Sequence, residues 1–153
     1  TSEDSIRWCQ NHLDKSNNDI EFIHLPAENA RYNPNAKGLQ HLPFEENEFD
    51  LIFLNSVFSH MLTDDIIFYL SEFNRVLKED GSIYLTAFIE ENVPSVQENP
   101  TNYLSKSSGA LHRVRYEKNY FFELIKDAKF ELSSFHHQLI TGTHQSVIVL
   151  KKL

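Results

Sequence analysis

Two stretches decide the fold: LPFEENEFDLIFLN (residues 42–55) and EFNRVLKEDGSIYLT (residues 72–86). The first is an acidic turn followed by an unbroken apolar run, which predicts a strand over residues 49–55 that is covered on both faces. The second ends a helical pattern at Gly81 and continues into another apolar run, which predicts a strand over residues 82–89. We expect Gly81 to adopt the left-handed conformation that closes a helix.

The segment between these strands, residues 64–78, has the clearest helical pattern of the chain. Four apolar side chains recur at helical spacing and form one stripe: Ile66, Leu70, Phe73 and Leu77. The pattern predicts a helix that packs across the sheet, with Thr63 as its N-cap. A strand, a helix and a second strand in this order are typical of an α/β domain with a mainly parallel sheet.

The flanking regions predict the remaining elements. A helix near the start is capped by Thr1 or Ser2, and a short β-rich run at residues 20–25 predicts a strand that ends at Pro26. A second amphipathic helix is expected over residues 117–128. Residues 130–140 and 145–151 are predicted to close the chain as a strand pair, which adds an antiparallel C-terminal strand to the sheet.

Composition narrows the class of protein. The chain has 153 residues, is 41% hydrophobic and can bury the core of one domain. Its 14 basic and 22 acidic residues give a net charge of −8, which argues against nucleic-acid binding. The lone cysteine, Cys9, fits a reducing compartment such as the cytoplasm. No apolar run reaches the roughly 20 residues that cross a bilayer, so we expect no membrane partner.

Four segments resemble, in the right order, the class I S-adenosylmethionine-dependent methyltransferases of type 11. Residues 2–9 resemble the helix after that family's second strand, and residues 26–29 the segment after its third. Residues 43–55 are similar to the acidic turn and fourth strand, and RVLKEDG (75–81) to the helix end RVLKPGG. The resemblance implies a partial Rossmann-like sheet, S-adenosyl-L-methionine as cofactor and a small-molecule substrate.

The chain also departs from that family. The family binds its cofactor with a Gly-rich turn, whose glycines let backbone N–H groups approach the ligand. The glycines here are too far apart for such a turn: Gly38, Gly81, Gly109 and Gly142. The chain also begins with Thr rather than Met. We therefore expect one methyltransferase-like domain over residues 1–153 that is N-terminally truncated, and weak or no cofactor binding by these residues alone.

The resemblance implies a set of cofactor-binding residues, and it names no catalytic residue. Those residues are Ala27, Glu28, Asn55, Ser56, Val57 and His60. Glu28 stands near the position where an Asp is usual, and Asn55 to His60 follow a strand at its ligand-binding end. The alternative is that the latter residues form an ordinary turn. His60 as a general base is weighed against a surface histidine.

Other functions remain open. A non-catalytic methyltransferase-like binding or scaffold module is the main alternative, and another nucleotide-binding enzyme is disfavoured because no phosphate-binding loop is present. His136, His137 and His144 do not predict a metal site, because adjacent histidines on a strand point to opposite faces. Without the family's first strands, two bare strand edges would remain, which leaves self-association open.

Overall fold

The structure is a computed structural model that describes residues 2–13, 20–103 and 106–153. The chain divides into two compact units, Thr1–Leu42 and Pro43–Leu153. Each unit is described by itself below. The single domain expected over residues 1–153 remains a prediction.

The first unit contains helix α1 (Glu3–His12) and extended chain. Ser2 is the N-cap, as predicted, and its hydroxyl oxygen accepts the N–H of Ser5 at 3.3 Å. The strand predicted over residues 20–25 is wrong: this segment is extended but forms no strand. A strand needs a neighbouring strand for its backbone groups. In this segment the Phe22 carbonyl instead accepts from a side chain, Gln10 Nε2, at 2.7 Å.

The second unit is built on a six-stranded sheet: β1 (Phe49–Leu54), β2 (Leu77–Glu90), β3 (Val96–Glu98), β4 (Val114–Glu117), β5 (Phe130–Ile140) and β6 (Gln145–Lys152). The order is β3-β4-β2-β6-β5, and β1 pairs with β2. The predicted α/β fold class is confirmed, as are the sheet of β1, β2 and β6 and the terminal strand pair. Antiparallel pairings outnumber parallel ones in the described sheet, because β3 folds back on β4 and the β5–β6 hairpin pairs with β2.

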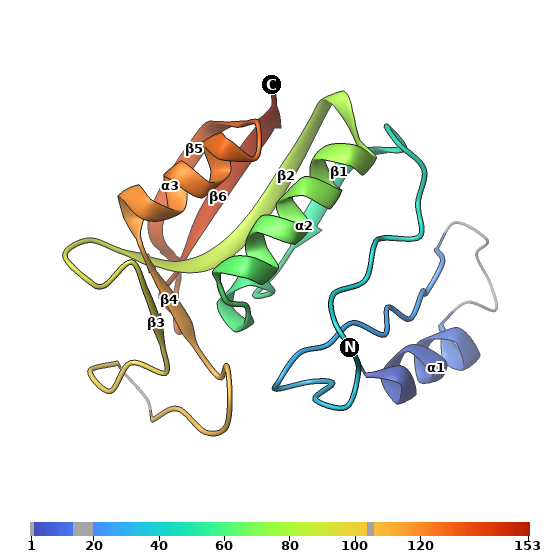
Figure 1. Cartoon of the computed structure of the whole chain (residues 1–153), viewed down its shortest axis with the longest axis horizontal. Coiled ribbons are helices and arrows are strands. Elements are labelled where there is room, and N and C mark those ends of the chain that lie inside the picture. Colours follow the sequence, from blue (N-terminus) through green and yellow to red (C-terminus); the bar gives the residue numbers. More distant parts are fainter. Residues whose placement is uncertain (1, 14–19, 104–105) are drawn as a thin grey trace. The chain divides into compact units, whose positions relative to one another are not determined.

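Strand β2 is the centre of this sheet and runs through its whole length (Figure 1). Strand β6 pairs with one edge of β2, from Ser82 to Ala87. The other edge is shared: β1 pairs with it as far as Leu85, and β4 pairs with it from Phe88 onward. The edge is therefore split at Thr86 and Ala87, just where β1 ends.

Two helices lie side by side across one face of the sheet, α2 (Thr63–Val76) and α3 (Lys118–Asp127) (Figure 1). Asn74 Nδ2 on α2 donates to the Ala128 carbonyl at the end of α3, at 3.3 Å. The side chains of α2 that face the sheet are buried, as the apolar stripe predicted. They belong to a core that also includes residues from β2, α3, β6 and the segment after β1: Phe58, Ile66, Leu70, Phe73, Ile83, Leu85, Phe121 and Ile148.

Two local predictions about α2 are wrong. The N-cap is Leu62 rather than Thr63, and the Asp65 carboxylate accepts the Leu62 N–H at 3.2 Å. Gly81 lies inside β2 and is not left-handed. A Cβ at Gly81 would lie 2.5 Å from Cγ of Leu77, so glycine is needed here for a close approach and not for a turn.

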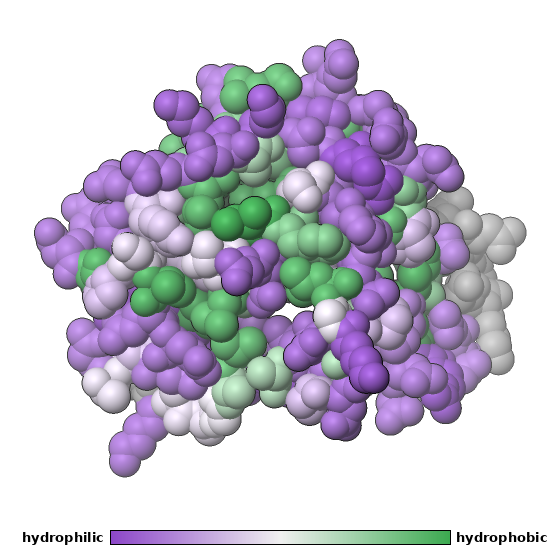
Figure 2. Space-filling view, in the orientation of Figure 1, coloured by the Kyte–Doolittle hydropathy of each residue, from purple (hydrophilic) through white to green (hydrophobic). Residues whose placement is uncertain are grey.

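Strand β1 is covered on one face only, which contradicts the prediction of two covered faces. Leu51 and Phe53 are 58% and 62% exposed, and Phe53 stacks on Tyr84 of β2 with ring centroids 5.0 Å apart. Apolar residues also reach the surface on the helical side, where Figure 2 shows them gathered over α2 among polar residues. Ile67 on α2 is about half exposed.

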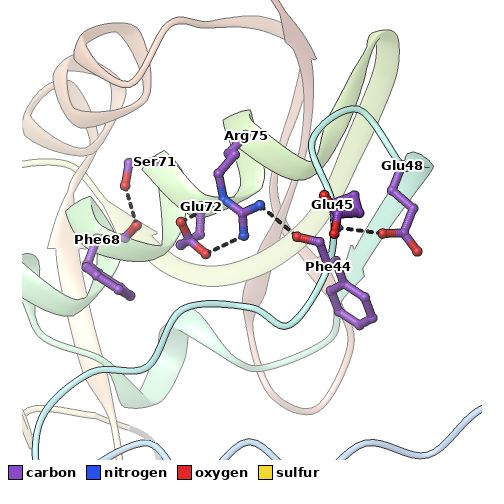
Figure 3. Close-up of polar contacts among 7 residues, drawn as sticks. All are labelled: Phe44, Glu45, Glu48, Phe68, Ser71, Glu72 and Arg75. Atoms are coloured by element: carbon purple, nitrogen blue, oxygen red, sulfur yellow. Dashed lines mark hydrogen bonds and ion pairs between the residues drawn. The ribbon is translucent and has the colours of Figure 1, made fainter.

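The side chain of Arg75 ties α2 to the acidic turn before β1 (Figure 3). The Arg75 guanidinium donates to both carboxylate oxygens of Glu72, at 3.1 and 2.8 Å, and to the Phe44 carbonyl at 2.7 Å. The bond to buried Glu72 raises the pKa of Arg75 above its ordinary value. Within the turn, the Glu48 carboxylate accepts the Glu45 N–H at 2.8 Å. This cluster fixes where β1 begins.

Candidate functional site

A pocket of about 290 Å³ lies where the edge of β2 is split. Its lining comes from the segment after β1, from β2, from the loop before β4 and from the β5–β6 turn: Ser56, His60, Phe88, Tyr103, His112, Arg113, Gly142, Thr143 and Gln145. In α/β sheets ligands bind outside the carboxyl ends of the strands, where neighbouring connections diverge. The pocket has this position relative to β1, so the sheet topology makes it the candidate site.

The backbone turns sharply as it leaves β1. Ser56 has a φ of 59°, in the left-handed region that a residue with a side chain seldom adopts. The Ser56 N–H donates to Thr86 Oγ1 at 2.8 Å. On the split edge, the Thr86 side chain thus accepts a hydrogen bond in place of the backbone of a neighbouring strand. The turn directs the following residues over the end of the sheet, where Val57 begins the short 3-10 helix η1 (Phe58–His60).

A ring of polar side chains holds this turn in place. Gln145 Nε2 donates to Ser56 Oγ at 2.8 Å, and Ser59 Oγ donates to the Ser56 carbonyl at 2.9 Å. The two serine hydroxyls are 2.9 Å apart, and the proton on Ser59 is used by the carbonyl, so Ser56 donates to Ser59. Thr86 donates to Gln145 Oε1 at 2.7 Å. Each hydroxyl thus donates once and accepts once, as buried polar groups require.

His60 and His112 present opposite tautomers in the neutral state. His60 Nδ1 lies 2.9 Å from the Leu111 carbonyl, which can only accept, so Nδ1 carries the proton and Nε2 carries the lone pair. The Ser108 N–H donates to His112 Nδ1 at 2.7 Å, so the proton of His112 is on Nε2. The two neutral rings therefore differ in which nitrogen carries the proton.

Arg113 forms the aromatic wall of the pocket with two rings. Its guanidinium carbon lies 4.2 Å from the Tyr103 ring centroid and 5.3 Å from that of Phe88, and the residue is 8% exposed. Such stacking fixes the guanidinium plane. Burial raises the pKa of Tyr103 to about 12, and the charge of Glu90 adds to the rise. Tyr103 is therefore protonated at neutral pH.

Strand β4 is anchored to the segment after η1. The Tyr116 hydroxyl donates to the Met61 carbonyl at 2.8 Å, and burial raises the pKa of this phenol above its ordinary value. Arg115, its neighbour, is buried in an ion pair with Glu90 at 2.9 Å. These contacts hold Arg113 and His112, just before β4, against the carboxyl end of β1.

The six residues expected at the site fall into two groups. Ser56 and His60 line the pocket, whereas Asn55 and Val57 adjoin them in sequence and are not among its lining residues. Asn55 Oδ1 is 3.5 Å from Thr86 Oγ1. The other two expected residues, Ala27 and Glu28, lie in the first unit.

In that unit Ala27 is buried, and its carbonyl accepts from Asn33 Nδ2 at 3.2 Å. The Glu28 carboxylate accepts the Gly38 N–H at 2.8 Å, and the Glu28 N–H donates to the Gly38 carbonyl at 2.9 Å. Ala27 and Glu28 belong to the first unit and the Asn55–His60 segment to the second, and a site shared by them remains a prediction.

Sequence reasoning missed most of the pocket lining, including Gln145 and Arg113, and it missed Thr86, which supports the Ser56 turn. Gln145 is the first residue of β6, where a polar residue before an apolar run signals the rim of a sheet, whereas Thr86 lies inside the apolar run of β2. Arg113 gave no such signal, because its aromatic partners are distant in sequence. Among the described residues, no group of three or more His, Cys, Asp or Glu side chains is arranged to hold a metal ion. In the same residues, no helix has the length and apolar character of a membrane span.

Comparisons with known proteins give one matching family model and a set of solved structures with a similar fold. A family model described as a methyltransferase domain matches residues 1–85, more than half of the chain. A SAM-dependent methyltransferase from Methanosarcina mazei superposes with a TM-score of 0.60 at 16% identity, covering 99% of this chain and 79% of that one.

Two further solved structures carry chemical information in their names. The 1,6-didemethyltoxoflavin-N1-methyltransferase of Burkholderia thailandensis, solved with 1,6-didemethyltoxoflavin and S-adenosylhomocysteine, has a TM-score of 0.52 at 20% identity, over 70% of this chain and 45% of that one. The [4+2]-cyclase SpnF has a TM-score of 0.53 at 15% identity, over 76% of this chain and 54% of that one. The chain thus spans about half the length of these two proteins, and at such identities the likeness concerns the fold.

Proposed function

The chain belongs to the methyltransferase domain family, and on that premise we propose that it forms part of an S-adenosyl-L-methionine-dependent methyltransferase that acts on a small molecule. One observation carries the proposal: the family match ends within β2, after spanning β1 and the turn that opens the pocket. The pocket volume of about 290 Å³ is just below that of typical small-molecule sites, which span roughly 300–1,000 Å³.

Family membership confirms the resemblance to class I methyltransferases and, with it, S-adenosyl-L-methionine as the cofactor. We further propose that the two units belong to one domain. The family match supports this, because residues 1–85 cross the boundary between Leu42 and Pro43. A cytoplasmic location is part of the same proposal and rests on the single cysteine.

The residues after β1 suit one end of the cofactor. The Asn55 amide offers a donor and an acceptor, and the Ser56 turn presents backbone groups beside it, which suits an amino-acid moiety. Glu28 is proposed to accept from the adenine amino group. The Gly-rich turn that this family uses is missing from the 153 residues, so we propose that tight cofactor binding needs a longer protein that carries it.

The cofactor supplies the methyl group when it is bound, and the pocket residues would orient the acceptor. Alignment of the reacting atoms is the main requirement for such a transfer. His60 lines the pocket, and we propose that its imidazole takes the proton of an acceptor hydroxyl or amine. In that case the pH–rate profile of the longer protein loses its acidic limb in His60→Gln, and an unchanged profile would exclude His60 as the base.

Cofactor binding to the longer protein tests the site. Val57→Trp should abolish binding in calorimetry, because the indole would fill the space beside the Ser56 turn. Ile67→Trp, a similar enlargement on the exposed side of α2, is the matched control and should leave binding unchanged. Glu28→Ala should weaken binding by about 0.5–1.5 kcal/mol, the contribution of one hydrogen bond. Wild-type affinity in Val57→Trp would refute the assignment.

A non-catalytic binding module is the second candidate. The missing Gly-rich turn favours it, and the similar [4+2]-cyclase illustrates that a fold alone does not fix the chemistry. Calorimetry on a mass-verified sample of residues 1–153 bears on both candidates. We expect weak or no binding of S-adenosyl-L-methionine, and sub-micromolar binding would show that these residues suffice. Failure of the longer protein to bind the cofactor would favour the module.

A further inference from the structure

We propose that a second pocket, at the start of α3, binds a primary ammonium group. The pocket has a volume of about 370 Å³, within the range of roughly 300–1,000 Å³ that is typical of small-molecule sites. It shares no lining residue with the pocket at the end of β1, and a ligand bound here is independent of the proposed function. The lining comes from the end of β2, the start of α3 and β5: Glu90, Glu91, Lys118, Phe135, His137 and Gln138.

A distortion of β5 gathers three of these side chains on one side. Phe135 and His137 are two residues apart, so they point to the same face of a strand. Gln138 would point to the opposite face, but it has a left-handed φ of 47° at an irregularity in the pairing of β5 with β6, and it lines the same pocket. Strained residues and bulges that re-aim a side chain in this way are common at binding sites.

Lys118 shows how an ammonium group is held in this pocket. Its Nζ lies 5.4 Å from the centroid of the Phe135 ring and donates to Glu91 Oε1 at 2.7 Å. The face of an aromatic ring attracts a cation, and an ionised carboxylate accepts its N–H groups. The hydrogen bond and the charge of Lys118 lower the pKa of Glu91, so this carboxylate is ionised at neutral pH. The lining is therefore chemically suited to an ammonium group.

Three acceptors in the lining have no donor among the described residues: Glu91 Oε2, the Gln138 amide oxygen and Glu90 Oε1. Glu90 Oε1 is buried, whereas Glu90 Oε2 accepts from Arg115 at 2.9 Å. A buried carboxylate oxygen without a donor costs free energy. The last torsion of a glutamate side chain has a broad minimum, so this oxygen can turn toward a donor in the pocket.

The unused acceptors decide the class of ligand. An ammonium group brings three N–H donors and no acceptor, which is what these side chains lack. The lining also holds two carboxylates, Glu90 and Glu91, against the single ammonium of Lys118. A cationic ligand therefore balances the charge of the lining, whereas an anionic ligand would add to the negative charge. The geometry and the charge together point to an amine.

The direct test is a chemical-shift titration of residues 1–153 with benzylamine, which carries an ammonium group at neutral pH. We expect shifts at the lining residues and an affinity about tenfold above that of benzyl alcohol, the neutral isostere. Benzyltrimethylammonium keeps the charge but has no N–H donor, and it should also bind about tenfold more weakly. Equal affinity for benzyl alcohol would overturn the proposal, and equal affinity for the quaternary compound would overturn the assignment to a primary ammonium group.

Tryptophan at two neighbouring positions of β5 localises the site. His137→Trp should block the pocket and abolish benzylamine binding, because His137 lines it. His136→Trp is the matched control, since both histidines are exposed but adjacent residues of a strand point to opposite faces. The control should change the affinity by less than about twofold. Binding that survives His137→Trp, or an equal loss in His136→Trp, would refute the site.

Removal of one charge tests the carboxylate. Glu90→Gln keeps the shape of the side chain and should weaken benzylamine binding by about tenfold. Glu123→Gln removes the same charge from the exposed side of α3 and should change the affinity by less than about twofold. Unchanged affinity in Glu90→Gln would contradict the proposed role of this carboxylate. If Glu90→Gln fails to fold because Arg115 loses its partner, the comparison of His137→Trp with His136→Trp decides.

Discussion

Residues 1–42 and residues 43–153 differ in what holds them together. Within residues 2–13, 20–103 and 106–153, all but one of the buried apolar side chains belong to the second unit, and the exception is Ala27. Helix α1 buries no residue, whereas α2 buries six. Helices in proteins are stabilised mainly by packing of an apolar face. The comparison indicates that the second unit carries the cooperative folding of this chain and that the first adds little to it.

The largest expected effect sharpens this contrast. Leu70→Ala removes a fully buried side chain from α2 and should lower the free energy of unfolding by about 2–5 kcal/mol. Ile6→Ala in α1 is the matched control, because Ile6 is only half-buried, and it should cost less than about 1 kcal/mol. Denaturant titrations measure both values. Equal losses in the two variants would contradict the inference that the second unit carries the cooperative folding.

A smaller effect is expected from the Glu72–Arg75 ion pair on α2. Glu72→Gln removes the carboxylate that positions the Arg75 guanidinium, which donates to the Phe44 carbonyl of the acidic turn. Thermal denaturation should show a loss of unfolding free energy that is smaller than for Leu70→Ala but larger than the roughly 0.5 kcal/mol of ordinary surface substitutions. Glu3→Gln, which removes the analogous exposed pair with Arg7 in α1, should cause no measurable loss. A larger loss for Glu3→Gln would reverse the contrast.

Alkaline pH tests the second unit alone. The pKa of Tyr103 is raised from its ordinary 10.0 to about 12, so the folded state holds a proton that the unfolded chain releases first. Its stabilising contribution is complete below pH 10 and is lost as the pH rises toward 12. Tyr103→Phe should therefore show a smaller fall in stability over this range. An identical fall in Tyr103→Phe would show that other groups cause the loss of stability at alkaline pH.

The smallest expected effect concerns the first unit. Ser2→Ala removes the N-cap of α1 and should destabilise that helix by about 1 kcal/mol. Amide hydrogen exchange should quicken in α1 and stay unchanged in α2, because the cap supports no packed core. Faster unfolding or a lower midpoint for the whole protein would indicate that the units unfold together.

The sequence predicted those elements whose signals are local. The apolar stripe of α2 and the long apolar runs of β1, β2 and β6 carry their own periodicity, so each was found within a few residues. Strands β3 and β4 were missed because they are short and rely on partners far along the chain. Arg115 in β4, for example, is buried with partners from three other segments, Glu90, Gln97 and Asn102.

The site was predicted in part for the same reason. Ser56 and His60 follow directly from the end of β1, where α/β sheets bind ligands. Gln145 reaches Ser56 from 89 residues away and Thr86 from 30, and such contacts leave no trace in local spacing. Arg113 depends on rings from two other segments. Residues brought together by topology could be found only once the topology was known.

The shared edge of β2 also has a consequence for how the chain folds. During synthesis, β1 emerges shortly before β2 and can pair with it at once. The opposite edge of β2 is covered only after β6 has been made, because Ser82 pairs with Lys151. Long-range pairings of this kind slow folding, and during synthesis they leave an uncovered strand edge exposed to other chains. The centre of the sheet is thus the part of the protein that is completed last, and co-translational aggregation is the hazard against which its chaperones would act.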